Sequence, residues 1–291
     1  MRFKIVLLSV FIGFNSIIAQ DNNVSAGVDF SFVPEHSNSV GFQNKVVSIN
    51  FPVKIKSGLL LNSLQFSNYQ MNYDSDLKMN TSFIDEDTFK TISYSMSYIN
   101  SINNNWSYLV EVKPVLSSNF ATDITSNDFL LNGGIILTKK YESSSFQLGA
   151  IKNSSYGFNS IIPVIAFNGN LSDKVSYTLG IPITELTYKV NQTNTFKTYI
   201  KPNGFYANIG NEAFEDTTSI AEKARFQSIV SGINFSHSID DNWKIGLDVG
   251  YQISSTYELL DKNKNSVYEF QTKNNVNVGV SLKFNLLNNK N

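Results

Sequence analysis

Few side chains of this 291-residue protein could do covalent chemistry, because it has two histidines and no cysteine. His237 is the stronger candidate, since Ser236 and Ser238 flank it. A serine nucleophile and a histidine base must lie within hydrogen-bond reach of each other. Neighbouring side chains of an extended strand point to opposite faces, so both serines are expected to point away from the histidine. We therefore expect no catalytic site here, and a lipid-modifying enzyme of the outer membrane that uses His237 is the alternative.

The sequence also supports no metal or cofactor site. The acidic run Asp85, Glu86 and Asp87 offers oxygen ligands, but it lacks the glycine turn and the spacing of a dedicated calcium site. His36 has no partner that the sequence identifies. Phosphate loops, zinc-ligand spacings and dinucleotide fingerprints do not occur. We expect no metal, no cofactor and, from the near balance of 23 basic and 24 acidic residues, no nucleic-acid partner.

The first residues have the pattern of a secretory signal peptide. Arg2 and Lys4 precede an apolar run over residues 5–14, which is too short to span a bilayer as a helix. We predict a signal peptide at 1–19, cleaved after Ala19, and one domain at 20–291. The protein is therefore expected to be exported, and the bacterial outer membrane is its predicted location.

Strict alternation of apolar and polar residues dominates the rest of the chain. In WKIGLDVGYQIS, residues 243–254, every odd-numbered residue is apolar or aromatic and every even-numbered one is polar or glycine. The same period of two recurs at 25–32, 106–113, 175–184 and 276–286. Side chains of a strand point to opposite faces in turn, so each of these strands has one apolar face and one polar face.

Short turns separate these strands. An apolar residue, three loop residues and a second apolar residue follow one another at 55–59, 102–106, 171–175 and 239–243. A three-residue hairpin loop then predicts apolar cross-strand pairs. These pairs are Met96–Val112, Tyr98–Val110, Ile165–Ile181, Phe167–Leu179, Ile233–Val249 and Phe235–Leu247. A bulge is predicted in the strand after residue 59, because Ser63 and Gln65 fall on its apolar side.

The pattern predicts an all-β fold, a transmembrane antiparallel up-and-down β-barrel. The strands are long, aromatic residues gather beside the short turns, and the other loops are long and polar, as in bacterial outer-membrane barrels. A soluble β-sandwich, which also alternates, is the alternative. The predicted aromatic girdle at the membrane interface consists of Tyr98, Trp106, Tyr108, Phe167, Tyr177 and Trp243.

About twelve strands are predicted, and both chain termini lie at the end of the short turns. They begin near residues 24, 43, 59, 88, 106, 127, 146, 158, 175, 225, 243 and 267. Residues 191–223 are predicted to form a long external loop, because the apolar segments 196–200 and 205–209 are shorter than a spanning strand. Two further spanning strands there, 14 in all, are the alternative. Bulges or strand ends are expected where prolines interrupt predicted strands, at Pro52, Pro114, Pro163 and Pro182.

The polar faces predict what lines the lumen. The charged candidates are Asp29, Lys54, Glu111, Lys113, Lys244, Asp248 and Lys283. Their mixed signs favour ion pairs that fill the interior over a pocket for a charged solute, although lumen side chains also set selectivity. We expect a small channel, a ligand-binding barrel or a structural barrel. Its expected partners are outer-membrane lipids, the outer-membrane assembly machinery and a small solute in the lumen. A surface adhesin or partner-docking protein that works through its external loops is a further alternative.

Four stretches resemble a known family. They are IIAQ at 17–20, IIPVIAFNGNLSDKVSYTLGIP at 161–182, GFYANI at 204–209, and YEF with VGVSLKF within 268–284. In these stretches the chain resembles uncharacterised outer-membrane β-barrels of Bacteroidota that are described by a domain of unknown function. The resemblance implies a barrel fold and an outer-membrane location for the mature chain. It implies no activity and no catalytic residues.

Overall fold

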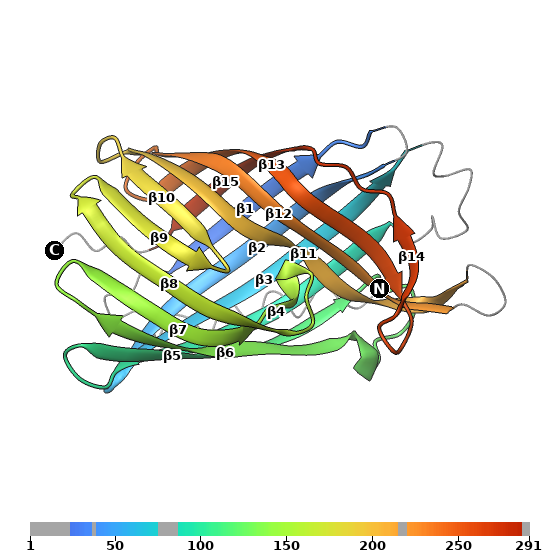
Figure 1. Ribbon diagram of the computed structural model, residues 1–291, viewed down its shortest axis with the longest axis horizontal. Coiled ribbons are helices and arrows are strands. Elements are labelled where there is room, and N and C mark those ends of the chain that lie inside the picture. Colours follow the sequence, from blue (N-terminus) through green and yellow to red (C-terminus); the bar gives the residue numbers. More distant parts are fainter. Residues whose placement is uncertain (1–23, 37–38, 75–86, 215–219, 287–291) are drawn as a thin grey trace.

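The structure, a computed structural model, describes residues 24–36, 39–74, 87–214 and 220–286. Its strands form a closed antiparallel barrel of 14 strands, with one further strand, β14, outside the ring (Figure 1). The ring runs in chain order from β1 to β13, and β15 closes it between β13 and β1. The predicted all-β transmembrane barrel is confirmed, with the alternative count of 14 strands in place of twelve.

The chain contains fifteen strands and two short 3-10 helices within the described residues. The strands are β1 (Ser25–Val33), β2 (Val40–Ile55), β3 (Gly58–Tyr73), β4 (Thr88–Ser101), β5 (Trp106–Ser118), β6 (Phe129–Lys140), β7 (Ser144–Lys152), β8 (Ile161–Ser172), β9 (Val175–Ile181), β10 (Thr184–Lys189), β11 (Asn194–Phe214), β12 (Ile220–Ser238), β13 (Trp243–Leu260), β14 (Ser266–Phe270) and β15 (Val276–Asn285). The helices are η2 (Ser126–Asp128) and η3 (Ser154–Tyr156). No helix of the described chain is long and apolar enough to cross a membrane.

The two ends of the barrel differ in their connections. At one end, which we call the turn end, turns of two to four residues join β2 to β3, β4 to β5, β6 to β7, β8 to β9, β10 to β11 and β12 to β13. The chain enters β1 and leaves β15 at the same end, since Ser25 pairs with Asn285. At the other end, the loop end, the connections are longer except between β9 and β10.

The cross-strand registers confirm the predicted hairpins. Tyr98 lies opposite Val110, and all six predicted apolar pairs occur in the β4–β5, β8–β9 and β12–β13 ladders. These pairs place apolar side chains together on the outer face, as the alternation requires.

The predicted bulge in β3 is wrong, because the β2–β3 turn is shorter than its sequence pattern indicated. Ile55 pairs with Gly58, which leaves a turn of two residues, and the register then continues without a shift. The shorter turn moves the pairing by one position and brings Phe66 opposite Val47. The apolar faces of β2 and β3 therefore match without an extra residue.

Apolar side chains cover the outside of the barrel. Val28, Ile135, Leu148, Leu247 and Val280 are each about half exposed or more, although they lie in the middle of paired strands. A soluble sheet would bury such residues, whereas a membrane barrel presents them to acyl chains. The closed ring and this apolar belt exclude the soluble sandwich.

The β9–β10 hairpin is the irregular part of the ring. Its strands have seven and six residues, and the hairpin stops midway along the barrel in Figure 1. The next strand, β11, has 21 residues and pairs with β12 along most of its length. The predicted external loop 191–223 is therefore wrong, because residues 194–214 form β11 and residues 220–223 already belong to β12.

Prolines mark places where strands lack a neighbour. Pro163 on β8 and Pro202 on β11 lie beyond the last residues that pair with the short hairpin, and Pro182 is in the turn of that hairpin. Pro52 lies beyond Asn50, the last residue of β2 that pairs with β1, and Pro114 faces a lapse in the β4–β5 ladder. Sheets tolerate proline at such free edges and irregularities. The prediction of bulges or strand ends is confirmed at Pro163 and Pro182, whereas the ladders at Pro52 and Pro114 contain no register shift.

At the loop end, β11 leaves the wall of short strands and joins β5. Asn208 pairs with Ser118 in parallel, and the Asn119 backbone N–H donates to the Asn208 carbonyl over 3.1 Å. The Asn208 side chain donates to Asp128 Oδ1 over 2.8 Å and accepts from Lys223 Nζ over 2.7 Å. This contact narrows the interior at the loop end, because it bypasses strands β6 to β10.

Packed rings fill the narrowed part. The aromatic cluster consists of Phe42, Tyr69, Tyr73, Phe89, Phe205, Phe226, Tyr257 and Phe270. Phe89 and Tyr257 are fully buried, and their rings stack on Phe205 and Phe270 at centroid distances of 4.9 and 4.7 Å. Tyr73 and Tyr257 also join their hydroxyl groups over 3.0 Å. These rings therefore form a closely packed apolar region in the interior at the loop end.

Phe89→Ala is expected to destabilise the barrel by about 3–5 kcal/mol, because it leaves a cavity in the aromatic cluster. Urea unfolding in detergent micelles measures the change. Phe129→Ala is the matched control, since Phe129 is 59% exposed on the outer face and detergent fills the space it leaves. Equal losses in the two variants would contradict a packed interior at Phe89.

Asp128 is expected to make the loop-end contact sensitive to acid. Burial raises the pKa of its carboxyl, but hydrogen bonds from the Thr125 backbone and from the Ser118, Asn208 and Thr125 side chains outweigh that effect and lower the pKa. A lowered pKa in the folded state adds stability above the ordinary value of 3.8, and that stability is lost as the pH falls through the folded pKa.

Asp128→Asn should therefore lower the urea midpoint at pH 7, with a difference from the unchanged protein that narrows below pH 3.8. Asp123→Asn, in the same loop and exposed, is the control. A difference that stays constant with pH would show that the charge of Asp128 contributes nothing.

Candidate functional site

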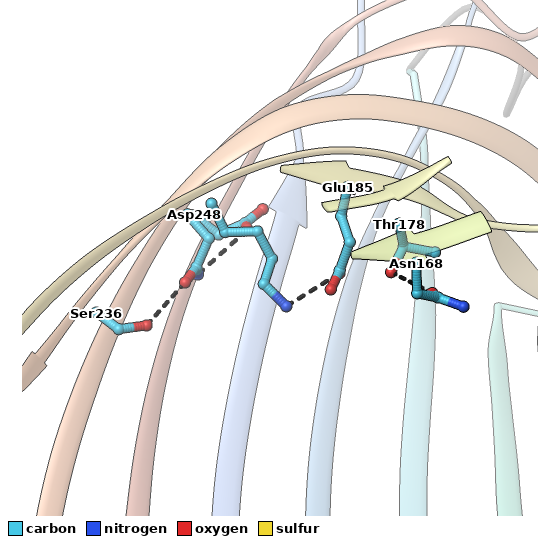
Figure 2. A network of polar contacts seen from close by, with 7 residues as sticks. Asn168, Thr178, Glu185, Ser236 and Asp248 are labelled. Atoms are coloured by element: carbon cyan, nitrogen blue, oxygen red, sulfur yellow. Dashed lines mark hydrogen bonds and ion pairs between the residues drawn. The ribbon is translucent and has the colours of Figure 1, made fainter. Parts of the chain in front are cut away.

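A polar chamber of about 670 Å³ occupies the interior toward the turn end. Its walls come from β1, β2, β10, β11, β12, β13 and β15, whose inward-facing positions are mostly polar. Figure 2 shows part of this interior, with Ser236 and Asp248 on one side and Glu185, Thr178 and Asn168 on the other. The volume lies within the range of small-molecule sites.

Lysines give the chamber its charge. Lys189, Lys197, Lys201, Lys244 and Lys283 line it. The acidic residues of the lining are Asp29 and Asp248, so the lining carries an excess of three positive charges. We call this space the basic chamber.

Most of these lysines are not neutralised by a carboxylate. Lys197 Nζ pairs with Glu185 Oε2 at 3.0 Å, and Figure 2 shows this contact. Within the described part of the chain, the other four lysines have no carboxylate within 4.0 Å. Lys244 lies directly opposite Lys283 in the β13–β15 ladder, where like charges repel each other. An anion bound between them would relieve that repulsion.

The carboxylate oxygens of Asp248 accept hydrogen bonds from neutral donors. The Tyr199 hydroxyl donates to Oδ1 over 2.6 Å, and Asn234 Nδ2 donates to Oδ2 over 3.4 Å. Ser236 Oγ in turn donates to Asn234 Oδ1 over 2.9 Å (Figure 2). These bonds hold the carboxylate on the chamber wall and leave the lysines available to a solute.

The predicted lumen residues divide into two groups. Asp29, Lys244, Asp248 and Lys283 line the basic chamber. Lys54, Glu111 and Lys113 lie outside its lining, and Glu111 accepts a hydrogen bond from Ser95 Oγ. The sequence therefore predicted the charged lining residues on β1, β13 and β15.

Lys189, Lys197 and Lys201 were not among the predicted lumen residues, although they line the chamber. The expectation that mixed charges pair within the lumen is wrong for the chamber, where only Lys197 of the five lysines has a carboxylate partner among the described residues. Lys197 and Lys201 belong to β11, which was predicted as an external loop. Alternation was present there, since Lys197, Tyr199 and Lys201 share one face of the strand. Extending that alternation through residues 201–204 would have predicted that Lys197 and Lys201 face the lumen.

The predicted girdle residues lie beside the turns. Tyr98 packs against Tyr108 and Phe167 against Tyr177, each with ring centroids 6.0 Å apart. Two further aromatic contacts occur at the same end: Trp243 lies 4.5 Å from Phe284 between centroids, and Lys139 Nζ lies 5.6 Å from the Trp106 ring. Their role at a membrane interface stays a prediction.

The histidines form no catalytic pair with serine in the described structure. His237 Nδ1 lies 2.8 Å from Asn194 Oδ1, whereas Ser236 lines the chamber on the opposite face of β12. His36 uses its backbone N–H to bond Ser39 Oγ over 3.0 Å. Among the described residues, no group of His, Asp and Glu could hold a metal ion. Asp85 and Glu86 of the acidic run lie outside the described residues, as does the predicted signal peptide. Asp87 is described, and its Oδ1 accepts a hydrogen bond from Thr88 Oγ1 over 2.7 Å.

Tyr199→Phe is expected to cost about 1.5–3 kcal/mol of unfolding free energy, because it removes a hydrogen bond to a charged acceptor. Urea unfolding in micelles measures the loss. Tyr188→Phe, on the exposed outer face of β10, is the control. A loss no larger than that of the control would show that the Tyr199 hydroxyl does not hold Asp248.

Solved structures with a similar fold are outer-membrane channels. The "TodX deltaS2S3 mutant monoaromatic hydrocarbon channel" has a TM-score of 0.50 at 8% identity, covering 91% of this chain and 90% of the other. The "COG4313 outer membrane channel from Pseudomonas putida F1" has a TM-score of 0.49 at 10% identity and 91% and 96% coverage. The "KdgM porin" has a TM-score of 0.37 at 9% identity and 89% and 98% coverage. At this identity, the TodX likeness shows a common barrel fold.

No curated protein matches the chain. A family model does match, over residues 41–286, which include all strands from β3 to β15. The resemblance to a barrel family described by a domain of unknown function is thereby confirmed. The chain belongs to the family described as "Domain of unknown function (DUF6268)".

Proposed function

We propose that this protein is an outer-membrane channel selective for small anionic solutes, with the basic chamber as its selectivity region. The observation that carries the proposal is the set of five lysines in one chamber, four of them without a carboxylate partner among the described residues. Charged side chains of the lumen set the selectivity of such barrels. The barrel fold that it shares with a solved channel supports the channel class.

The aromatic cluster is the proposed limit on conduction. Its rings fill the interior at the loop end, whereas the basic chamber lies toward the turn end. A solute that crosses the barrel must therefore pass rings that are closed in this structure, and the proposed channel conducts when they rearrange.

Outer-membrane lipids are the proposed surroundings of the apolar belt, and the outer-membrane assembly machinery is the proposed route of insertion. The predicted signal peptide supports export. The closed 14-stranded ring supports a place in the bacterial outer membrane, since outer-membrane-type barrels are closed rings of this kind.

The two alternatives have lost their main support. An adhesin working through residues 191–223 would need a long loop, and most of those residues form β11 and β12. A lipid-modifying enzyme would need a serine within reach of His237, whose ring bonds to Asn194 instead.

In planar bilayers with a KCl gradient, the reversal potential is expected to show preference for chloride. The double variant Lys244→Gln and Lys283→Gln should move the permeability ratio toward unity, because it removes two unpaired charges from the chamber. Lys45→Gln is the matched control, since Lys45 is exposed on the outer face of β2 and is absent from the chamber lining.

A preference for potassium in the unchanged protein would contradict the anion selectivity. Absence of conductance steps above background would remove the channel itself. Equal shifts in the double variant and the Lys45 control would show that the charge of the chamber does not set selectivity.

A further inference from the structure

The basic chamber adjoins a second pocket of about 260 Å³. Asn44, Val46, Lys201 and Asn203 line both spaces, so a molecule at this boundary contacts the two at once. The walls of the second pocket come from β2, β3, β4, β5, β11 and η3. We call it the hydroxyl pocket.

Hydroxyl groups dominate its lining. They belong to Ser67, Thr91, Ser93, Ser117, Ser154 and Ser155, with three tyrosines in addition. Among the described residues, the lining holds no carboxylate, and Lys201 is its single charged side chain. Apart from Lys201, the pocket is therefore neutral and polar, whereas the adjoining chamber has five lysines.

These hydroxyl groups keep capacity for a ligand. Thr91 Oγ1 and Ser117 Oγ share one hydrogen bond of 2.8 Å, and Ser67 Oγ donates to Asn44 Oδ1 over 3.0 Å. A hydroxyl offers one donor and two acceptor sites, so one bond leaves others unused. Ser93, which is 4% exposed, makes no side-chain hydrogen bond to another described residue.

An unpaired acceptor lies in the wall of the basic chamber as well. Asn277 is 7% exposed, and its Oδ1 has no hydrogen-bond partner among the described residues. Buried acceptors are normally paired, but no described residue supplies a donor to this oxygen. A ligand with a hydroxyl group could supply that donor. A simple anion such as chloride has no donor to offer, whereas a ligand with hydroxyl groups has several.

We propose that the solute is a polyhydroxylated anion of the sugar-acid class. The proposal rests on the anion selectivity proposed above and names the substrate class of the same site. The lysines of the basic chamber hold the carboxylate, and the hydroxyl pocket exchanges hydrogen bonds with the ring hydroxyls. Lys201 and Asn203, which line both spaces, contact the ligand where its charged and neutral parts meet.

Calorimetric titration of the full-length protein in detergent micelles tests the proposal with three probes: glucuronate, cyclohexanecarboxylate and glucose. The first two carry the same charge on a six-membered ring and differ in their hydroxyl groups and in the ring oxygen of glucuronate. Glucuronate is expected to bind about tenfold tighter than cyclohexanecarboxylate, because a site built to hydrogen-bond hydroxyl groups rejects an analogue that lacks them. Glucose, which lacks the charge, should bind more weakly than glucuronate.

The double variant Ser93→Ala and Ser117→Ala should reduce the preference for glucuronate and leave the affinity for cyclohexanecarboxylate unchanged. Ser231→Ala, on the outer face of β12, is the matched control and should keep the full preference. Heat-modifiable migration in gels establishes that each variant forms the barrel.

The outcomes separate the two proposals. If both acids bind equally well, the sugar-acid proposal is overturned while anion selectivity stands. If neither acid binds, or if glucose binds as tightly as glucuronate, anion recognition by the basic chamber fails too. An unchanged preference in the serine double variant would overturn the assignment of the hydroxyl pocket.

Discussion

The structure depends on one constraint, which is that a strand in hydrocarbon must pair its backbone on both edges and keep its polar side chains inside. The period of two makes this constraint strict, since a slip of one residue would move every side chain to the other face. Asp248 illustrates the consequence, because in its actual register it accepts hydrogen bonds from Tyr199 and Asn234 within the lumen. In the slipped register the same carboxylate would face lipid.

The site arises where this constraint is relaxed. The β9–β10 hairpin ends midway, and the facing edges of β8 and β11 carry Pro163 and Pro202 beyond it. Released from β10, the outer part of β11 reaches β5, where Asn208 pairs with Ser118. That shift brings Phe205 against Tyr69 of β3 and Phe89 of β4, and it leaves the lysines of β11 in the chamber toward the turn end. The short hairpin therefore accounts for the separation of the aromatic cluster from the basic chamber.

Alternation, together with the turns and the aromatic residues beside them, predicted the barrel, three of the four hairpin registers and four lining residues of the chamber, because each of these depends on local pattern. It failed where pairing with a neighbouring strand determines the path of the chain. Pro202 and Gly204 look like a break in a strand, yet β12 pairs with β11 straight through them. Ile253 is an extra residue opposite β12, so the odd-numbered side chains turn from outward at Tyr251 to inward at Tyr257. The aromatic cluster follows from that bulge and from the path of β11, neither of which has a local signal.

The charges of the chamber support the proposed anionic ligand. Stability would favour a carboxylate opposite Lys244, but the residue there is Lys283, which breaks the usual rule for cross-strand pairs. Asp248 is near enough to line the same chamber, yet its oxygens are taken by a hydroxyl and an amide. Local rules are broken in this way mainly at functional sites. The arrangement therefore favours an anion from outside the protein as the partner of these lysines.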